Sequence, residues 1–166
     1  MTLNSFQFNT TPGVRFGSGQ AKDACKDISN KLGECILFVT DKGLMSLGLT
    51  ETTLKELKKL GTVEVFDEVE ADPSKKTLLT AIEIGKKNKV TGVVGFGGGS
   101  SMDVAKLSAL ILGSNEDLEK AWGVANAKGP RLPLVLIPTT AGTGSEVTPV
   151  SIITVGEEEK KGVSSA

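Results

Sequence analysis

The chain contains no histidine and no tyrosine. Histidine is the side chain whose charge changes most readily near neutral pH, and it is the commonest protein ligand for zinc and similar metals. Its absence excludes a histidine general acid, general base or metal ligand from this sequence. If chemistry takes place at this domain, much of its machinery must come from elsewhere.

Cysteine is also scarce, because Cys25 and Cys35 are the only two. Two cysteines make no disulfide framework, so we expect a reduced, cytoplasmic protein in which both are buried as small apolar side chains. Nineteen basic and twenty acidic residues give a net charge of −1, and no basic patch suggests a nucleic-acid partner. No apolar run reaches membrane-spanning length and no signal-peptide core is present, so no membrane partner is expected.

Short apolar runs alternate with helical periodicity along the chain. Cys35–Val39, Val93–Phe96 and Leu134–Ile137 are continuously apolar, as strands buried on both faces are. This order predicts an α/β fold with a doubly wound, mainly parallel, Rossmann-like sheet in one domain over residues 1–166. Alternating Phe6, Phe8, Val14 and Phe16 predict an N-terminal β-hairpin. Further expected elements are helices at 20–32, 42–47, 53–60, 100–112 and 116–122, strands at 62–66 and 150–155, a solvated turn at 157–161 and a strand start at 162.

The first candidate site is the glycine turn Gly97-Gly98-Gly99, which ends the run Val93–Phe96. Ser100 then opens a helix, with Asp103 three residues on in a capping-box-like position. A glycine turn before a helix N-terminus offers free N–H groups and a favourable dipole to a phosphate. The alternative is a tight turn that needs positive φ angles and binds nothing. Three glycines after a buried strand favour the phosphate site, although the pattern is neither a Walker loop nor a standard Rossmann fingerprint.

Asp41 follows the strand Cys35–Val39. A carboxylate at this end of a parallel strand lies where dinucleotide folds bind the ribose hydroxyls. The other interpretation is a helix cap for residues 42–47, which is a common role of Asp. Position in the sequence favours neither.

A second polar loop, Thr139–Thr148, follows the strand Leu134–Ile137. Its four threonines, one serine and two glycines suit a ligand that needs hydrogen bonds more than charge, and they favour a binding loop over a flexible surface loop. A nucleophile elbow is excluded, because the pattern is not Gly-x-Ser-x-Gly and no histidine exists to activate Ser145.

Three stretches resemble the iron-containing (group III) alcohol dehydrogenase family: Gly97–Lys106, Pro138–Thr148 and Phe16–Gly19. The chain resembles only the N-terminal half of that family. The resemblance implies an NAD(P)-dependent oxidoreductase that interconverts an alcohol with an aldehyde or ketone. Its N-terminal domain binds the nucleotide, and a helical C-terminal domain holds a divalent metal, often iron, through one Asp and three His.

The resemblance also implies roles for individual residues. Gly98, Gly99 and Ser100 would hold the pyrophosphate, and Asp41 the adenosine ribose. With Asp41 at the ribose we expect NAD over NADP, because the 2′-phosphate of NADP would bring a second anion against its carboxylate. Asp103 and Lys106 would hold the loops in place. The remaining expected cofactor contacts are Asp72 near the adenine, with Thr139, Thr140, Thr143, Thr148 and Lys161 along the rest of the nucleotide cleft.

The family's metal ligands lie beyond Ala166, so Fe²⁺ or another divalent metal is expected only together with a C-terminal domain as partner. We therefore expect a fragment that binds the dinucleotide cofactor and is inactive alone. Two alternatives stay open: a stand-alone nucleotide-binding or regulatory module, and half of a dehydroquinate-synthase-like lyase. The loop Thr139–Thr148 argues against the lyase. A homo-oligomer is also left open.

Overall fold

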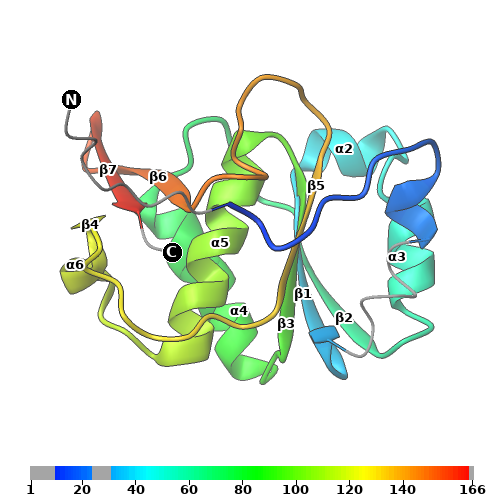
Figure 1. The fold of residues 1–166 in the computed structure, drawn as a ribbon, viewed down its shortest axis with the longest axis horizontal. Helices are drawn as coiled ribbons and strands as arrows, with labels where there is room; N and C mark the ends of the chain where they lie inside the picture. The colour runs from blue at the N-terminus through cyan, green and yellow to red at the C-terminus, as the bar shows by residue number, and fades with distance from the viewer. Residues whose placement is uncertain (1–9, 24–30, 165–166) are drawn as a thin grey trace, which may run out of the picture.

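A parallel sheet of four strands forms the centre of the computed structural model, which describes residues 10–23 and 31–164. The strand order is β2-β1-β3-β5, and all three pairings are parallel (Figure 1). The strands are β1 (Cys35–Val39), β2 (Thr62–Phe66), β3 (Gly92–Gly97) and β5 (Leu134–Pro138). The predicted Rossmann-like α/β architecture is confirmed.

Helices cover both faces of this sheet, because alternate side chains of each strand point to opposite sides. From β1, Leu37 and Val39 pack in one core with α4 and α5, whereas Ile36 and Phe38 pack in a second core with α3. The helices are α2 (Lys42–Ser46), α3 (Glu51–Leu57), α4 (Lys75–Lys87), α5 (Gly99–Ser114) and α6 (Leu118–Ala121). None of the helices in the described part of the chain is long and apolar enough to cross a bilayer.

The last strands do not extend the parallel sheet. β6 (Val150–Val155) and β7 (Glu159–Ser164) form an antiparallel hairpin, and β4 (Gly123–Val124) pairs with β7. This second sheet packs on α4 and α5, so that these helices lie between the two sheets (Figure 1). The expected solvated turn at 157–161 is therefore too long, because β7 already begins at Glu159.

The structure bears on only part of the expected N-terminal hairpin and first helix. The first arm of the expected hairpin lies outside the described residues. Its second arm is wrong as a strand, since Val14 and Phe16 are irregular and are 70% and 101% exposed. Of the expected helix at 20–32, residues 20–23 and 31–32 are helical and the rest lies outside the description, as does Cys25. Cys35 is only half-buried, and its thiol donates to the Asn88 carbonyl at 3.5 Å.

Candidate functional site

The two candidate loops leave the same edge of the parallel sheet. β3 and β5 are adjacent, and Gly97 at the end of β3 pairs in register with Pro138 at the end of β5. The Thr139 amide donates to the Gly97 carbonyl at 2.9 Å. Since the carboxyl ends of parallel strands share one edge, the glycine turn and the threonine loop begin side by side, where α/β folds bind ligands.

The glycine turn leads directly into the N-terminus of α5. Gly97 has φ +149°, and a Cβ there would lie 2.7 Å from Ser101 Oγ, so only glycine fits. Gly98 is the N-cap residue and supplies no side-chain cap. The first N–H groups of a helix lack intrahelical acceptors, and they lie at the positive end of the helix dipole. This helix start therefore suits an anion.

The threonine loop lies against this turn. A Cβ built on Gly98 would be 3.4 Å from Thr140 Oγ1, and one on Gly99 would be 3.4 Å from Thr143 Cγ2. Gly98, Gly99 and Ser100 are partly exposed, while Thr139, Thr140 and Thr143 are exposed. Hydroxyls and backbone N–H groups thus converge on one open surface, which is an arrangement that a pyrophosphate group fits.

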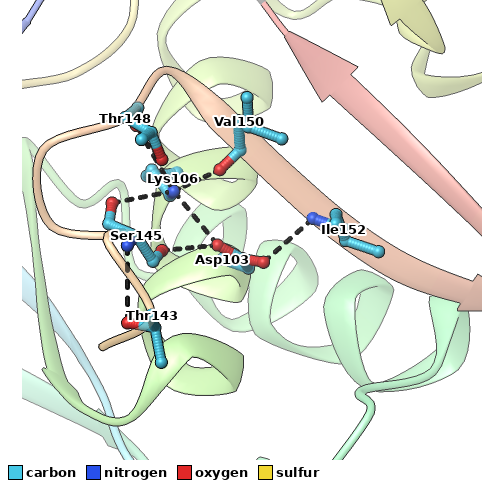
Figure 2. Close-up of polar contacts among 7 residues, drawn as sticks. All are labelled: Asp103, Lys106, Thr143, Ser145, Thr148, Val150 and Ile152. Carbon is cyan, nitrogen blue, oxygen red and sulfur yellow. Dashed lines mark hydrogen bonds and ion pairs between the residues drawn. The ribbon is translucent and has the colours of Figure 1, made fainter. Parts of the chain in front are cut away.

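Asp103 and Lys106, one turn apart on α5, join the helix to the loop and to β6 (Figure 2). Asp103 accepts hydrogen bonds from Ser145 Oγ at 2.6 Å and from the Ile152 amide at 3.0 Å. Lys106 Nζ lies 3.0 Å from Asp103 Oδ1 and donates to the carbonyls of Ser145 (3.0 Å), Thr148 (3.5 Å) and Val150. The expectation that this pair holds the loop agrees with these contacts.

The capping-box interpretation of Asp103 is wrong, since its carboxylate binds the loop and β6 instead of the helix start. Burial lowers the pKa of Lys106 below its ordinary range, while the nearby carboxylates of Asp103 and Glu146 act in the opposite direction. The side chains of Lys106 and Asp103 are only 10% and 14% exposed. The sequence did not identify Ser145 as a structural residue. Its burial in the structure, beside Asp103 and Lys106, indicates that it helps to hold the loop.

Asp41 acts as a helix cap in this structure. Its Oδ1 accepts from the Leu44 amide at 2.9 Å at the start of α2. It lies just beyond β1, the strand next to β3, and Leu44 Cδ1 would be 3.2 Å from a Cβ on Gly97. α2 thus packs beside the glycine turn. The cap uses one carboxylate oxygen, so a role toward a ribose stays a prediction.

Asp72 and Lys161 are tied to the β6–β7 hairpin. Asp72 precedes α4 with φ +53° and pairs with Lys160 of β7, and its carbonyl accepts from Thr154 Oγ1 at 3.2 Å. Lys161 lies in β7 opposite Ile153, and its Nζ is 3.8 Å from Glu159 Oε1. Thr148 is exposed, and its carbonyl faces Lys106. These contacts of Asp72 and Lys161 join α4 to the hairpin and not to the glycine turn, so the cofactor roles of both residues remain predictions.

A metal site does not fit the residues that the structure describes. No group of three or more His, Cys, Asp or Glu side chains among residues 10–23 and 31–164 lies close enough to hold a metal ion. The whole sequence also lacks histidine.

Comparisons with known proteins agree with one another. Residues 11–166 match the family model described as iron-containing alcohol dehydrogenase. A choline dehydrogenase from Bacillus subtilis is 38% identical over 163 residues, which are 96% of this chain and 40% of that protein. The structure of a 1,3-propanediol oxidoreductase superposes with a TM-score of 0.90 at 30% identity, covering 97% of this chain and 43% of that one.

A structure of sulfoacetaldehyde reductase from Bifidobacterium kashiwanohense in complex with NAD⁺ also matches. Its TM-score is 0.82 at 30% identity, and the match covers 98% of this chain and 43% of that one. The chain thus spans about two fifths of the length of these relatives, by the coverage of 40% and 43%. The matched part contains the glycine turn and the threonine loop.

Proposed function

Because this chain belongs to the iron-containing alcohol dehydrogenase family, we propose that residues 1–166 form the dinucleotide-binding domain of an NAD-dependent oxidoreductase. The whole protein would interconvert an alcohol with an aldehyde or ketone. The observation that carries the proposal is the contact between the two loops: Gly98 and Gly99, at the N-terminus of α5, lie against Thr140 and Thr143.

The residues present fit a dinucleotide. The backbone N–H groups after Gly98 would bind the pyrophosphate, because the helix start is a positive dipole end without a competing side-chain cap. Thr139, Thr140 and Thr143 would add hydroxyl donors from the other side. The bound nicotinamide would supply the hydride-transfer chemistry, while this domain binds and orients the cofactor. Thr148, Lys161 and Asp72 remain proposed contacts of the same ligand.

The metal ligands and the substrate pocket would come from residues outside this sequence, since the described part offers no metal-binding group. We propose that these 166 residues alone bind cofactor without turning over an alcohol. Metal analysis after dialysis and an alcohol-oxidation assay with added ferrous or zinc ion test this. Stoichiometric metal or measurable NADH formation would refute it.

Titration of the purified chain with NADH, followed by fluorescence or calorimetry, tests the cofactor assignment. Affinity should be weak, because the open surface at Gly98 would bury only part of the ligand. Absence of binding at millimolar NADH, a binding free energy weaker than about −4 kcal/mol, would overturn the assignment. If NADH binds, alcohol oxidation by the whole protein separates the enzyme from a stand-alone nucleotide-binding module.

NAD rather than NADP is the proposed cofactor. Asp41, beyond β1, would accept hydrogen bonds from the ribose hydroxyls, and a 2′-phosphate would bring a second anion against it. If the two charges lay about 4 Å apart in a medium with an effective dielectric constant of about 20, this repulsion would be about 4 kcal/mol. Asp41→Asn keeps an N-cap acceptor for Leu44 but removes the charge, so it should shift the ratio of dissociation constants toward NADP. Asp41→Gly removes both. An unchanged ratio in both variants would show that Asp41 is only a cap.

A further inference from the structure

Two carboxylates lie opposite each other where β1 and β2 end. Asp41, just after β1, and Glu68, just after β2, form an isolated antiparallel bridge. A backbone hydrogen bond supports this arrangement, because the Val69 amide donates to the Thr40 carbonyl at 3.3 Å. Residues that oppose each other in an antiparallel pair point their side chains to the same face, with Cβ atoms about 5 Å apart. The charges of Asp41 and Glu68 are therefore close together at the carboxyl edge of the sheet.

Like charges that lie opposite each other destabilise a strand pair. Lys42, the first residue of α2, offsets part of this repulsion, since its Nζ lies 3.5 Å from Glu68 Oε1. The Asp41 carboxylate accepts from the Leu44 amide instead. Glu68 thus engages the cation that is adjacent to Asp41 in the sequence, and the two carboxylates and one ammonium leave a net charge of −1.

This charge lies where the proposed ribose site would meet a 2′ substituent. A 2′-phosphate is an anion that a free basic side chain would stabilise, as an arginine does in sites that accept NADP. Lys42 is not free for this role, because Glu68 pairs with it. The side chains of Lys42 and Glu68 are 72% and 60% exposed, so their charges act through water and their effect is small and sensitive to salt.

We propose that Glu68 is a specificity-determining residue, which favours NAD over NADP by pairing with Lys42 and by adding a second carboxylate beside Asp41. The inference rests on the proposed function, because it needs the adenosine ribose at Asp41. Glu68 acts through its charge and not through a hydrogen bond to the ribose. Its removal should therefore change the affinity for NADP and leave the affinity for NAD, whose 2′ position carries a neutral hydroxyl.

The experiment compares Glu68→Gln, Glu68→Lys and the double variant Glu68→Gln/Lys42→Met with the unchanged chain. The dissociation constants of NADH and NADPH are measured by fluorescence at 0.1 M and 1 M salt. Glu68→Gln should lower the NADPH constant about threefold, the effect of one exposed charge, and Glu68→Lys, which reverses the charge, about tenfold. The NADH constant should change little. Both gains should be lost at 1 M salt, where the Debye length is about 3 Å. The double variant should lose the gain of Glu68→Gln, because the released Lys42 is absent.

Glu34→Gln is the matched control, since it removes one negative charge from an exposed side chain just before β1. β1 contains five residues, so Glu34 and Asp41 lie about 17 Å or more apart, beyond the Debye length of about 10 Å at 0.1 M salt. This variant should leave the ratio of the NADPH and NADH constants unchanged. Every substituted side chain is exposed, so thermal unfolding should differ little among the variants.

Three results would overturn the proposal: an unchanged ratio in Glu68→Gln and Glu68→Lys, an equal shift in Glu34→Gln, or a shift that persists at 1 M salt. If the unchanged chain binds NADH, these results leave the proposed function intact and remove only the role of Glu68. A chain that binds neither nucleotide would instead refute the proposed function, and the role of Glu68 would fall with it.

Discussion

Replacing Gly98 by alanine separates ligand binding from folding at the glycine turn. Gly98 has φ −78° and ψ −172°, which is extended backbone that any residue adopts. The nearest atoms to an added Cβ are Thr140 Oγ1 at 3.4 Å and Thr140 Cγ2 at 3.6 Å, which are ordinary contact distances. The fold should therefore accept the methyl group.

Two small terms set the change in stability. Alanine reduces the conformational freedom of the unfolded chain, which stabilises by about 0.4–1 kcal/mol. Alanine is also a poorer N-cap than glycine, which costs about 1 kcal/mol. The free energy of unfolding should thus change by less than about 1 kcal/mol, and the melting temperature by no more than about 2–4 °C. NADH affinity should fall about tenfold to a hundredfold, or about 1.4–2.7 kcal/mol, because the methyl group stands where the phosphate approaches the backbone.

Gly95→Ala is the matched control, because Gly95 lies in β3, three residues before Gly98. A Cβ on Gly95 would lie 2.7 Å from Ala105 Cβ and 2.9 Å from Leu136 Cδ2, closer than real Cβ contacts. This overpacking should cost about 1–3 kcal/mol and lower the melting temperature by several degrees. Thermal unfolding and NADH titration are run on both variants. Wild-type NADH affinity in Gly98→Ala would refute the phosphate assignment, and a large loss of stability would refute the steric argument.

Two predictions concern the dependence of stability on pH. Burial raises the pKa of Glu70, but hydrogen bonds to its carboxylate from Thr77 and Ser74 outweigh burial and hold the pKa below its ordinary value. Glu70→Gln should therefore lower the free energy of unfolding at pH 7, and urea unfolding should show this difference shrinking as the pH falls through the folded-state pKa of Glu70. Burial lowers the pKa of Lys106 in the folded chain. At pH values just below the ordinary lysine pKa, the unfolded chain therefore holds the Lys106 proton more tightly than the folded chain does. The contribution of Lys106 to the free energy of unfolding should rise with pH there, and the same titration of Lys106→Met should lack this rise.

The parallel sheet could be predicted because its strands carry their own signal. Cys35–Val39 and Val93–Phe96 are short and apolar throughout, and the structure buries them between two helical layers. The sequence predicted β6 as a strand, but it did not predict the second sheet to which β6 belongs. Val150–Val155 buries Ser151 and Ile153 and exposes Val150 and Ile152, as expected for a strand covered on one face. Its partner β7 begins with the charged residues Glu159, Lys160 and Lys161. In the sequence such a charged run resembles a solvated turn, although in the structure it is the start of a hairpin strand.

At the site, the sequence indicated the two loops but not how they are joined. The adjacency of the loops follows from the pairing of β3 with β5, and strand order is a property of the whole sheet that no local pattern encodes. The same is true of the contact between Thr143 and Gly99. The link through Ser145 depends on β6 lying on α5, so it could not be predicted while the second sheet was missing from the prediction.

The capping-box error shows how one shifted boundary changes the role of a residue. With Ser100 as the N-cap, Asp103 would be the third helical residue, the position from which a side chain reaches back to the cap. The helix instead begins at Gly99 with Gly98 as its N-cap, so Asp103 is the fifth helical residue and lies beyond that reach. Its carboxylate then binds Ser145 and the Ile152 amide. The same two-residue shift leaves the start of α5 without a side-chain acceptor. The anion site at Gly98 and the loop contacts of Asp103 are thus two consequences of where this helix begins.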